Sequence, residues 1–507
     1  MKKIGFENFR SLKNIEDIEI KPLTVIVGKN SSGKSTFLRA FPLLKQSIET
    51  KTNSPILWYD PNFVDYGSYD ECLNCKAKEE NVIVFRYCFE MNSKHETSYA
   101  LFFRKRKQVY GEINLEITIT KEKDNEYVKQ INLRIDESEI NLCLSKSSIF
   151  ESIVINGENL TPKIELHGIS INSIIPQMIA KEKDNFSFNF DLVDNNIFKI
   201  LGELTRKGTK KETLELMLHS FVIGGYEKFY KSFFKRGYPA TWYERVKNRE
   251  KNDPLFITLY NYFILSNLNH LLAEVDSYLS TYFGQVYYVA PVRATAERYY
   301  RIQGLAVNSI DPRGINLPMF LENQSKTDFL KFQKWTLENF KFEPIVSKEG
   351  GHLSISINID NQKINLADTG FGFSQILPII TQLWFVINQN NSRNSSTKTF
   401  VIEQPELHLH PSIQALLIDT FINILNYSAD KRIDLKIIFE THSETMINRI
   451  GQQIAYNNIK NDKINIVVFD TDGFETSTTT GLYDKKGQLK NWPFGFFYPD
   501  KISNNAF

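Results

Sequence analysis

The sequence has few cysteines, no long apolar run and almost no excess of either charge. Four cysteines among 507 residues cannot form the dense disulfide framework of a small secreted domain. No stretch reaches the roughly 18 apolar residues of a membrane-spanning helix, and the N-terminal M-K-K-I-G-F lacks a signal-peptide core. Because the net charge is only +2, nucleic-acid binding requires a local basic patch. These absences predict a soluble, cytoplasmic protein without a membrane segment.

The pattern along the chain predicts three segments. Residues 81–165 alternate apolar and polar side chains, as β-strands do, whereas residues 211–283 look helical and carry no sustained heptads. Long coiled-coil arms are therefore not expected. We expect an N-terminal segment with a β-rich lobe at 1–165, a mainly helical insertion at 166–283 and a C-terminal segment at 284–507.

A glycine-rich loop follows a predicted strand at Leu23–Gly28 and precedes a helical pattern. The loop reads G-K-N-S-S-G-K-S and matches G-x-x-x-x-G-K-[ST]. Its backbone N–H groups and the helix dipole favour phosphate; Lys34 is expected to reach the β- and γ-phosphates of ATP and Ser35 to hold Mg²⁺. The predicted nucleotide-binding residues are Gly28, Lys29, Asn30, Ser31, Ser32, Gly33, Lys34, Ser35 and Thr36.

Two further apolar strands end in polar residues. Thr399–Glu403 runs into Q-P-E, and Leu435–Glu440 runs into T-H-S, where Ser443 is expected to cap a helix. His442 therefore follows a core strand, at the edge where α/β sheets bind ligands. This position predicts that His442 senses the γ-phosphate, although a lone histidine is more often structural.

A second candidate phosphate nest reads D-T-G-F-G-F-S-Q and precedes an apolar helix. Two glycines and a serine at a helix start can bind an anion, and a plain helix cap is the alternative. The candidate residues are Gly370, Gly372, Ser374 and Gln375.

Together with F-E-N-F-R-S-L and I-E-Q-P-E-L-H-L-H-P, these motifs resemble the ABC-type ATPase heads of the SMC, RecF and OLD group. The resemblance covers roughly residues 1–90 and 280–500. It implies an α/β fold, an ABC-type P-loop ATPase head with a mixed sheet flanked by helices plus a β-rich lobe, split by a largely helical insertion.

The strings Y-Y-V-A-P-V-R and W-P-F-G-F-F narrow the resemblance to the PtuA-type ATPases of Septu and Septu-containing retron phage-defence systems. That resemblance implies a homodimer or higher oligomer in which the Gly370 nest of one subunit caps the ATP held by another. It also implies an HNH nuclease partner of the PtuB type and, in retrons, a reverse transcriptase with its RNA–DNA hybrid.

The acidic strand departs from the ABC pattern, in which the strand ends in Asp-Glu. In that alignment Glu403 is a metal ligand together with Ser35, and Gln404 occupies the position of the catalytic base. Glutamine can orient water but cannot take its proton. Either Glu406 is the base or turnover is slow. The expected catalytic set is Glu403, Gln404, Glu406 and His442.

The best nucleic-acid candidate is the segment 226–251, in which eight Lys/Arg and three Glu are interleaved with aromatic residues. Cations can neutralise phosphates and aromatic rings can stack on bases. The favoured alternative is a helical hairpin whose aromatic residues are core and whose lysines face water.

Other patterns predict no additional chemistry. Cys72 and Cys75 lack a second ligand pair suited to zinc, because Cys88 lies within a strand pattern and only His95 remains. Asp470 and Asp472 are expected in a hairpin rather than in a nuclease site. His408 and His410 are expected to fix a loop.

The leading hypothesis is an ATPase that controls a partner nuclease in anti-phage defence. A RecF-like DNA-repair ATPase and a scaffold stabilised by ATP with negligible hydrolysis are the alternatives.

Overall fold

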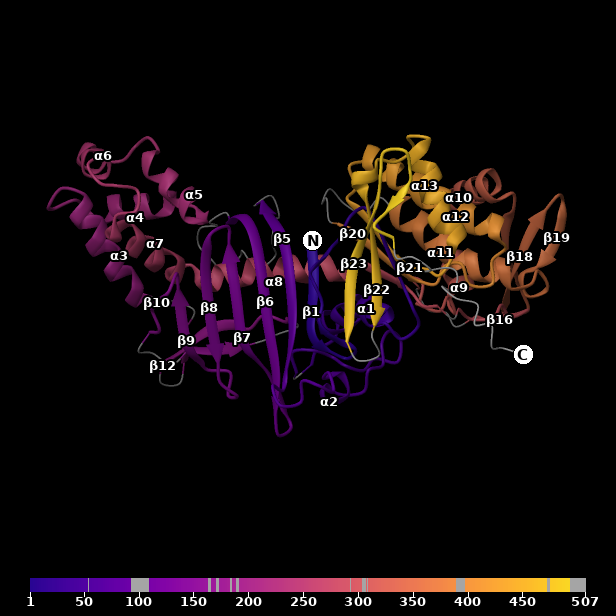
Figure 1. Cartoon of the computed structure of the whole chain (residues 1–507), viewed down its shortest axis with the longest axis horizontal. Coiled ribbons are helices and arrows are strands. Elements are labelled where there is room, and N and C mark those ends of the chain that lie inside the picture. The colour runs from indigo at the N-terminus through magenta and orange to yellow at the C-terminus, as the bar shows by residue number, and fades with distance from the viewer. Residues whose placement is uncertain are drawn as a thin grey trace, which may run out of the picture. The chain divides into compact units, whose positions relative to one another are not determined.

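The structure is a computed structural model, and its chain divides into two compact units (Figure 1). Unit 1 comprises Met1–Ile18, Gln46–Trp58 and Tyr66–Thr281; unit 2 comprises Glu19–Lys45, Tyr59–Asp65 and Tyr282–Phe507. The described residues are 1–52, 54–92, 109–162, 166–169, 173–182, 185–187, 191–291, 293–302, 307, 309–388, 397–471 and 475–492. None of the helices formed by these residues is long and apolar enough to cross a membrane.

The N-terminal part of the chain is divided between the two units. The glycine-rich loop belongs to unit 2 together with the C-terminal half, whereas the β-rich and helical segments belong to unit 1. The domain boundaries expected at residues 165 and 283 follow the order of the sequence, whereas each compact unit combines segments from separate parts of the chain. These boundaries therefore stay a prediction.

Unit 1 is built on a large, mainly antiparallel sheet with the order β10-β9-β8-β7-β6-β5-β1-β2. Along β8 buried residues alternate with more exposed ones, which confirms the strand pattern expected for this part of the chain. The strands of the large sheet are β1 (Lys3–Phe9), β2 (Leu12–Asn14), β3 (Ile18–Glu19), β5 (Val82–Asn92), β6 (Val109–Glu122), β7 (Asn125–Ile135), β8 (Ser138–Leu144), β9 (Phe150–Ile155), β10 (Glu158–Asn159) and β14 (Ile223–Gly224). Of these, β3 pairs with β1 and β14 pairs with β6. A small sheet contains β11 (Leu166–Ile169), β12 (Gln177–Glu182) and β13 (Asn185–Ser187).

Helices make up the C-terminal part of unit 1, as the sequence pattern predicts. They are α3 (Asp191–Leu204), α4 (Lys211–Ser220), α5 (Tyr226–Lys231), α6 (Ala240–Lys247), α7 (Pro254–Ser266) and α8 (Leu268–Gly284), which ends in unit 2. The short α2 (Tyr69–Cys72) lies earlier in the chain.

Unit 2 is built on a sheet with the order β15-β20-β21-β4-β22-β23-β24. The first five strands are parallel, and β23 and β24 are antiparallel additions. The strands are β15 (Val286–Val289), β20 (Lys398–Glu403), β21 (Leu435–Glu440), β4 (Leu23–Gly28), β22 (Ile464–Thr471), β23 (Thr476–Tyr483) and β24 (Leu489–Lys490). The β22–β23 pairing confirms the hairpin expected near Asp470, although Asp472 lies outside the described residues.

Helices flank this sheet, and a smaller antiparallel sheet completes unit 2. The helices are α1 (Lys34–Glu49), α9 (Leu317–Glu322), α10 (Lys326–Phe340), α11 (Phe371–Asn388), α12 (Pro411–Asp430) and α13 (Glu444–Ala455). The smaller sheet contains β16 (Tyr300–Arg301), β17 (Glu343–Glu349), β18 (His352–Ile359) and β19 (Gln362–Asn365).

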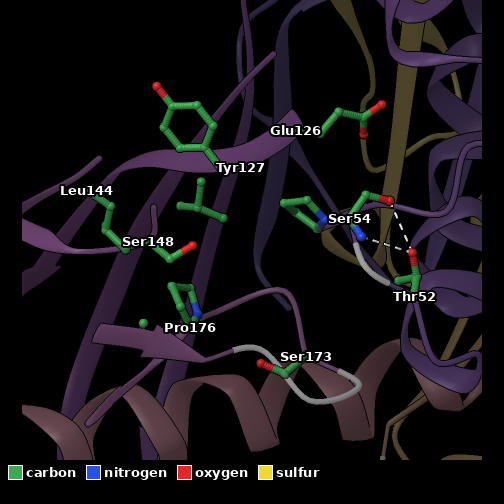
Figure 2. Close-up of a pocket in the computed structure, with 11 residues that line it drawn as sticks. Thr52, Ser54, Glu126, Tyr127, Leu144, Ser148, Ser173 and Pro176 are labelled. Atoms are coloured by element: carbon green, nitrogen blue, oxygen red, sulfur yellow. Dashed lines mark hydrogen bonds between the residues drawn. The ribbon is translucent and has the colours of Figure 1, made fainter. Parts of the chain in front are cut away.

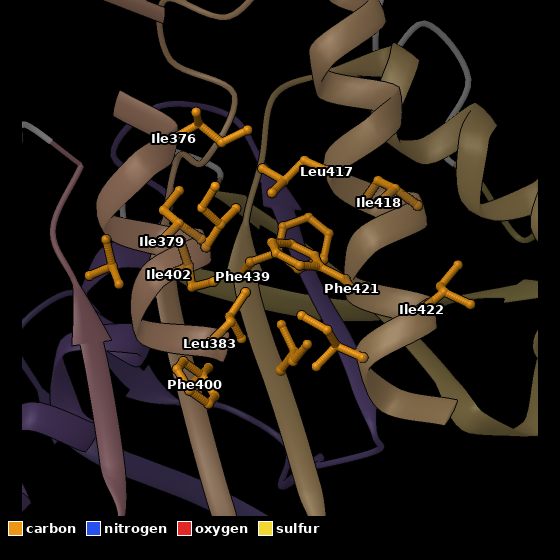
Figure 3. Close-up of a cluster of buried hydrophobic side chains, with 14 of the residues drawn as sticks. Ile376, Ile379, Leu383, Phe400, Ile402, Leu417, Ile418, Phe421, Ile422 and Phe439 are labelled. Atoms are coloured by element: carbon orange, nitrogen blue, oxygen red, sulfur yellow. The ribbon is translucent and has the colours of Figure 1, made fainter. Parts of the chain in front are cut away.

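The core of unit 2 fills the space between the parallel strands and helices α11 and α12. Figure 3 shows Ile379 of α11 and Phe421 of α12 approaching Ile402 and Phe439 on the strands. Alternate residues of β22 face opposite sides, so Phe469 instead meets Phe37 of α1, with ring centroids 5.8 Å apart. Helices therefore cover both faces of the parallel sheet, as parallel sheets require.

This arrangement confirms the expected fold class. A mixed sheet flanked by helices carries a glycine-rich loop at the end of its central strand β4, and a separate β-rich lobe and a helical insertion accompany it. The chain has the fold of an ABC-type P-loop ATPase head.

The packing around Leu417 generates a stability prediction. Leu417 is fully buried in α12, so Leu417→Ala is expected to lower the free energy of unfolding by about 2–5 kcal/mol. Leu330 on α10 is 64% exposed, and Leu330→Ala is expected to change it by less than about 0.5 kcal/mol. Urea unfolding followed by tryptophan fluorescence measures both. Equal losses in the two variants would contradict this core assignment.

Candidate nucleotide-binding site

The phosphate loop forms between β4 and α1 and permits only glycine at its first position. A Cβ at Gly28 would lie 2.1 Å from the Phe469 carbonyl oxygen, so β22 leaves no room for a side chain. Ser31 and Gly33 adopt φ values of 63° and 94° in the left-handed region. These turns bring the chain round to the N-terminus of α1, whose first turn contains no acidic residue.

Lys34 lies inside this loop and is only 3% exposed. Its Nζ donates hydrogen bonds to the carbonyl oxygens of Gly28, at 3.0 Å, and Lys29, at 2.6 Å. Burial lowers its pKa, and the nearby Glu440 carboxylate opposes this shift. A buried ammonium group held by a glycine-rich backbone loop fits the phosphates of a nucleotide.

Glu440, the last residue of β21, lies beside both phosphate-loop side chains. Its Oε2 accepts a hydrogen bond from Ser35 Oγ at 3.0 Å, and its Oε1 lies 3.6 Å from Lys34 Nζ. The Nε2 of His442 is also 3.6 Å from Oε1. Burial opposes the charge on Glu440, yet contacts with His442, Lys34 and Ser35 hold its pKa below the usual value.

Glu403 pairs with Glu440 in the parallel register but has different partners. Arg39 of α1 donates to both carboxylate oxygens, at 2.8 and 3.0 Å, and Tyr288 donates to Oε1 at 2.7 Å. The Glu403 side chain is 2% exposed. Burial raises its pKa, and Arg39 and Tyr288 oppose this shift.

The Q-P-E segment turns immediately after Glu403. Gln404 has a φ of 43°, in the left-handed region, and its backbone N–H donates to the Glu440 carbonyl at 3.1 Å. Glu406 Oε1 accepts a hydrogen bond from the His442 backbone N–H at 2.8 Å. Its Oε2 is buried without a hydrogen-bond partner among the described residues, and burial raises the Glu406 pKa.

Arg293 connects this segment to the start of α11. It is 3% exposed; its guanidinium donates to the Glu403 carbonyl at 3.2 Å and to Gln375 Oε1 at 3.3 Å. Burial lowers its pKa to about 10. The second candidate nest is therefore bonded to the acidic strand within one subunit.

The residues of that nest differ in accessibility. Gly370 is exposed, has a φ of 75°, and a Cβ there would meet no atom within 4 Å. Ser374 and Gln375 are 6% and 3% exposed. The two glycines are thus the members most open to an external ligand, whereas Gln375 bonds to Arg293.

The structure brings several predicted site residues together. Lys34, Ser35 and His442 meet at Glu440, and Ser443 caps α13 by accepting a hydrogen bond from Met446 N at 3.1 Å. Lys29, Asn30 and Ser31 lie on the exposed side of the loop. Sequence reasoning missed the contacts of Arg39, Tyr288, Arg293 and Glu440. Only Glu440 carried a signal, as an acid that ends an apolar core strand.

In the described part of the chain, the other histidines and cysteines singled out in the sequence lie outside the nucleotide-binding site. His410 caps α12, accepting a hydrogen bond from Ser412 N, and His408 adopts a left-handed φ of 61°. Cys72 and Cys88 are buried and Cys75 is exposed, and all three are free thiols; His95 lies outside the described residues. The described residues contain no group of three or more His, Cys, Asp or Glu arranged to hold a metal ion.

The segment 226–251 follows the favoured alternative of a helical hairpin with an aromatic core. Phe229, Phe233 and Trp242 are fully buried, and the Phe233 and Trp242 rings are 5.2 Å apart. Three of its lysines form ion pairs: Lys228 with Asp136 at 2.8 Å, and Lys231 and Lys251 with Glu227. These buried rings cannot stack on bases in this conformation.

A pocket of about 220 Å³ in unit 1 offers little chemistry for phosphate (Figure 2). Glu126 is the one charged residue in its described lining; burial raises its pKa, and it accepts a hydrogen bond from Trp58 Nε1 at 2.8 Å. Thr52, Ser54 and Ser148 supply hydroxyl groups. Without a described basic residue, this pocket does not suit a nucleotide.

Endonuclease GajA of Bacillus cereus is 21% identical over 509 residues, which cover 96% of this chain and 62% of GajA. The chain thus spans less than two thirds of that relative.

Similar solved structures include SMC heads and a RecF protein. The Smc head bound to the C-winged helix domain of ScpA has a TM-score of 0.33 and 11% identity, covering 94% of this chain and 97% of that one. The SMC head domain from Thermotoga maritima has 0.34 and 9%, with the same coverages. The recombination mediator RecF has 0.31 and 11%, again covering 94% and 97%.

The model of the AAA ATPase domain family matches residues 1–447. Because this match covers most of the chain and includes the phosphate loop, the acidic strand and His442, the protein belongs to the AAA ATPase domain family.

Proposed function

We propose that this protein is a slow, Mg²⁺-dependent ATPase whose ATP-loaded heads pair and thereby control a partner nuclease in defence against phage. The observation that carries the proposal is the convergence of Lys34, Ser35 and His442 at Glu440, beside the phosphate loop. A buried lysine, a hydroxyl and a carboxylate at a helix N-terminus are the groups that hold a nucleotide with its metal.

Each residue has a distinct task in this proposal. ATP supplies the phosphoanhydride bond, and Mg²⁺ the positive charge that polarises it. The loop N–H groups and Lys34 hold the phosphates; Ser35 is a metal ligand through its hydroxyl; His442 contacts the γ-phosphate. Gly370, Gly372, Ser374 and Gln375 of the opposite subunit close the site, with the two glycines making the first approach because they are accessible.

We propose slow turnover because a glutamine, Gln404, occupies the position of the catalytic base. Gln404 can orient a water molecule but cannot accept its proton. Glu406 has a buried Oε2 without a described partner, and burial moves its pKa upward, closer to neutral pH, where a general base is most effective. Glu406 is therefore our candidate base, and its bond to the His442 backbone orients it toward the same edge of the sheet.

The nuclease partner is supported by resemblance and similarity. PtuA-type ATPases work with an HNH nuclease and, in retrons, with a reverse transcriptase and its RNA–DNA hybrid. GajA is named an endonuclease, and part of it lies outside the match to this chain. We therefore propose that an HNH protein of the PtuB type supplies the nuclease, with the retron components as an additional assembly.

Two alternative functions differ in what they require. A RecF-like DNA-repair ATPase needs a DNA-binding surface, and the buried aromatic rings of residues 226–251 reduce the support for that segment. A scaffold stabilised by ATP predicts bound ATP without phosphate release. DNA binding by the isolated protein that depends on ATP would favour the first alternative.

Lys34→Ala is expected to weaken ATP binding by about 10- to 100-fold, because a charge-assisted contact contributes about 1.5–3 kcal/mol. Titration calorimetry measures the affinity, and a plaque assay measures whether protection against phage is lost as well. Lys334→Ala, on an α10 side chain that is 78% exposed, is the matched control and is expected to retain both properties. Unchanged affinity and protection in Lys34→Ala would reject the proposal.

Gln404→Glu is expected to accelerate phosphate release by about 10²-fold or more, because it restores a general base. Gln404→Asn keeps the amide and tolerates the left-handed conformation, so it is expected to remain slow. Glu406→Gln is expected to reduce the residual wild-type rate. If Gln404→Glu is no faster than the wild type, position 404 does not limit turnover.

A further inference from the structure

The two acidic strand ends lie side by side but have unlike surroundings. Glu403 and Glu440 are register partners on β20 and β21, and Glu440 is in turn paired with Ile26 of β4, the strand that leads into the phosphate loop. β21 therefore lies between β20 and the phosphate-loop strand. The carboxylate nearest in the sheet to Ser35 belongs to Glu440.

Glu403 has no carboxylate oxygen that is free of strong donors. Oε1 accepts from Arg39 Nε and Tyr288 OH, and Oε2 accepts from the second Arg39 nitrogen. To reach a metal ion, the buried Glu403 carboxylate would give up a bidentate pair with the half-exposed Arg39 guanidinium and leave the buried Tyr288 hydroxyl without its acceptor. Such charge-assisted bidentate pairs are among the strongest side-chain contacts.

Glu440 instead faces the group that is expected to bind the metal. The Ser35 hydroxyl donates its hydrogen to Glu440 Oε2, which leaves the lone pairs of the Ser35 oxygen available to a cation. Lys34 and His442 are beside the other carboxylate oxygen. Hydroxyl and carboxylate oxygens are hard ligands of the kind Mg²⁺ prefers.

We propose that Glu440, rather than Glu403, is the acid on the metal side of the nucleotide site, and that Glu403 is a positioning residue tied to Arg39 and Tyr288. This inference rests on the proposed ATPase function and assigns a role to a residue outside the expected acidic motif. Glu440 binds the cation or one of its waters, and it holds the Ser35 hydroxyl in the orientation that exposes its lone pairs. Glu403 fixes α1 and β15 to the end of β20.

The test compares nucleotide affinity with and without Mg²⁺, using the slowly hydrolysed analogue ATPγS in titration calorimetry. In the wild type, Mg²⁺ is expected to tighten binding relative to EDTA. Glu440→Gln is expected to reduce this enhancement by about 10-fold or more and to leave the affinity in EDTA within about threefold. Glu403→Gln is expected to keep the enhancement and to show a lower melting temperature, because it removes the bidentate acceptor of Arg39 and the acceptor of the buried Tyr288 hydroxyl.

Asp434→Asn is the matched control. Asp434 precedes β21 at the end opposite Glu440, and its side chain is 52% exposed, so this variant is expected to behave like the wild type. If Glu440→Gln does not fold, Glu440→Asp is used instead; it keeps the charge but shortens the reach, and it is expected to lose part of the Mg²⁺ enhancement while melting like the wild type.

The outcomes separate this inference from the function on which it rests. No ATPγS binding by the wild type in either condition rejects the ATPase proposal itself. Full Mg²⁺ enhancement in the folded Glu440 variant overturns the assignment of Glu440. Loss of enhancement in Glu403→Gln, alone or together with the Glu440 variant, overturns the positioning role of Glu403.

Discussion

The parallel pairing of β20, β21 and β4 is the constraint on which the rest of unit 2 depends. Because parallel strands point the same way, their carboxyl ends reach one edge of the sheet, and the register joins Glu403 to Glu440 and Glu440 to Ile26. Residues more than 400 positions apart in the sequence, such as Ser35 and Glu440, meet there as a consequence. The hydrophobic cores on the two faces of the sheet stabilise this pairing, because parallel strands are normally buried on both faces.

Local patterns were sufficient to predict the elements that carry the site. The strands Leu23–Gly28 and Leu435–Glu440 occur with the predicted bounds, and β20 begins one residue earlier, at Lys398. The cap at Ser443 forms as predicted, because cap preferences depend on short-range hydrogen bonds. Buried parallel strands and helix caps are readable from a few neighbouring residues.

The partners of the acidic residues could not be predicted from the sequence in the same way. Arg39 is one of several polar residues in an amphipathic helix, Tyr288 lies within a short strand, and nothing in their own neighbourhoods indicates that both bond to Glu403. Such contacts are set by helix-to-sheet packing rather than by local propensity. The alternation of charge and aromatic residues in 226–251 was equally ambiguous, since a core-forming helical hairpin and a nucleic-acid surface share that composition.

The left-handed backbone of Gln404 restricts which sequences can explore this site. A φ of 43° is tolerated by glycine and, at modest cost, by Asn or Asp, whereas β-branched side chains at such a position are strained. In a library of all amino acids at position 404, many variants are therefore expected to be destabilised by backbone strain, whatever their effect on catalysis. Among acidic replacements, aspartate fits the turn more easily and glutamate reaches farther. Evolution of a faster enzyme from this chain thus involves a compromise between conformational ease and reach at a single position.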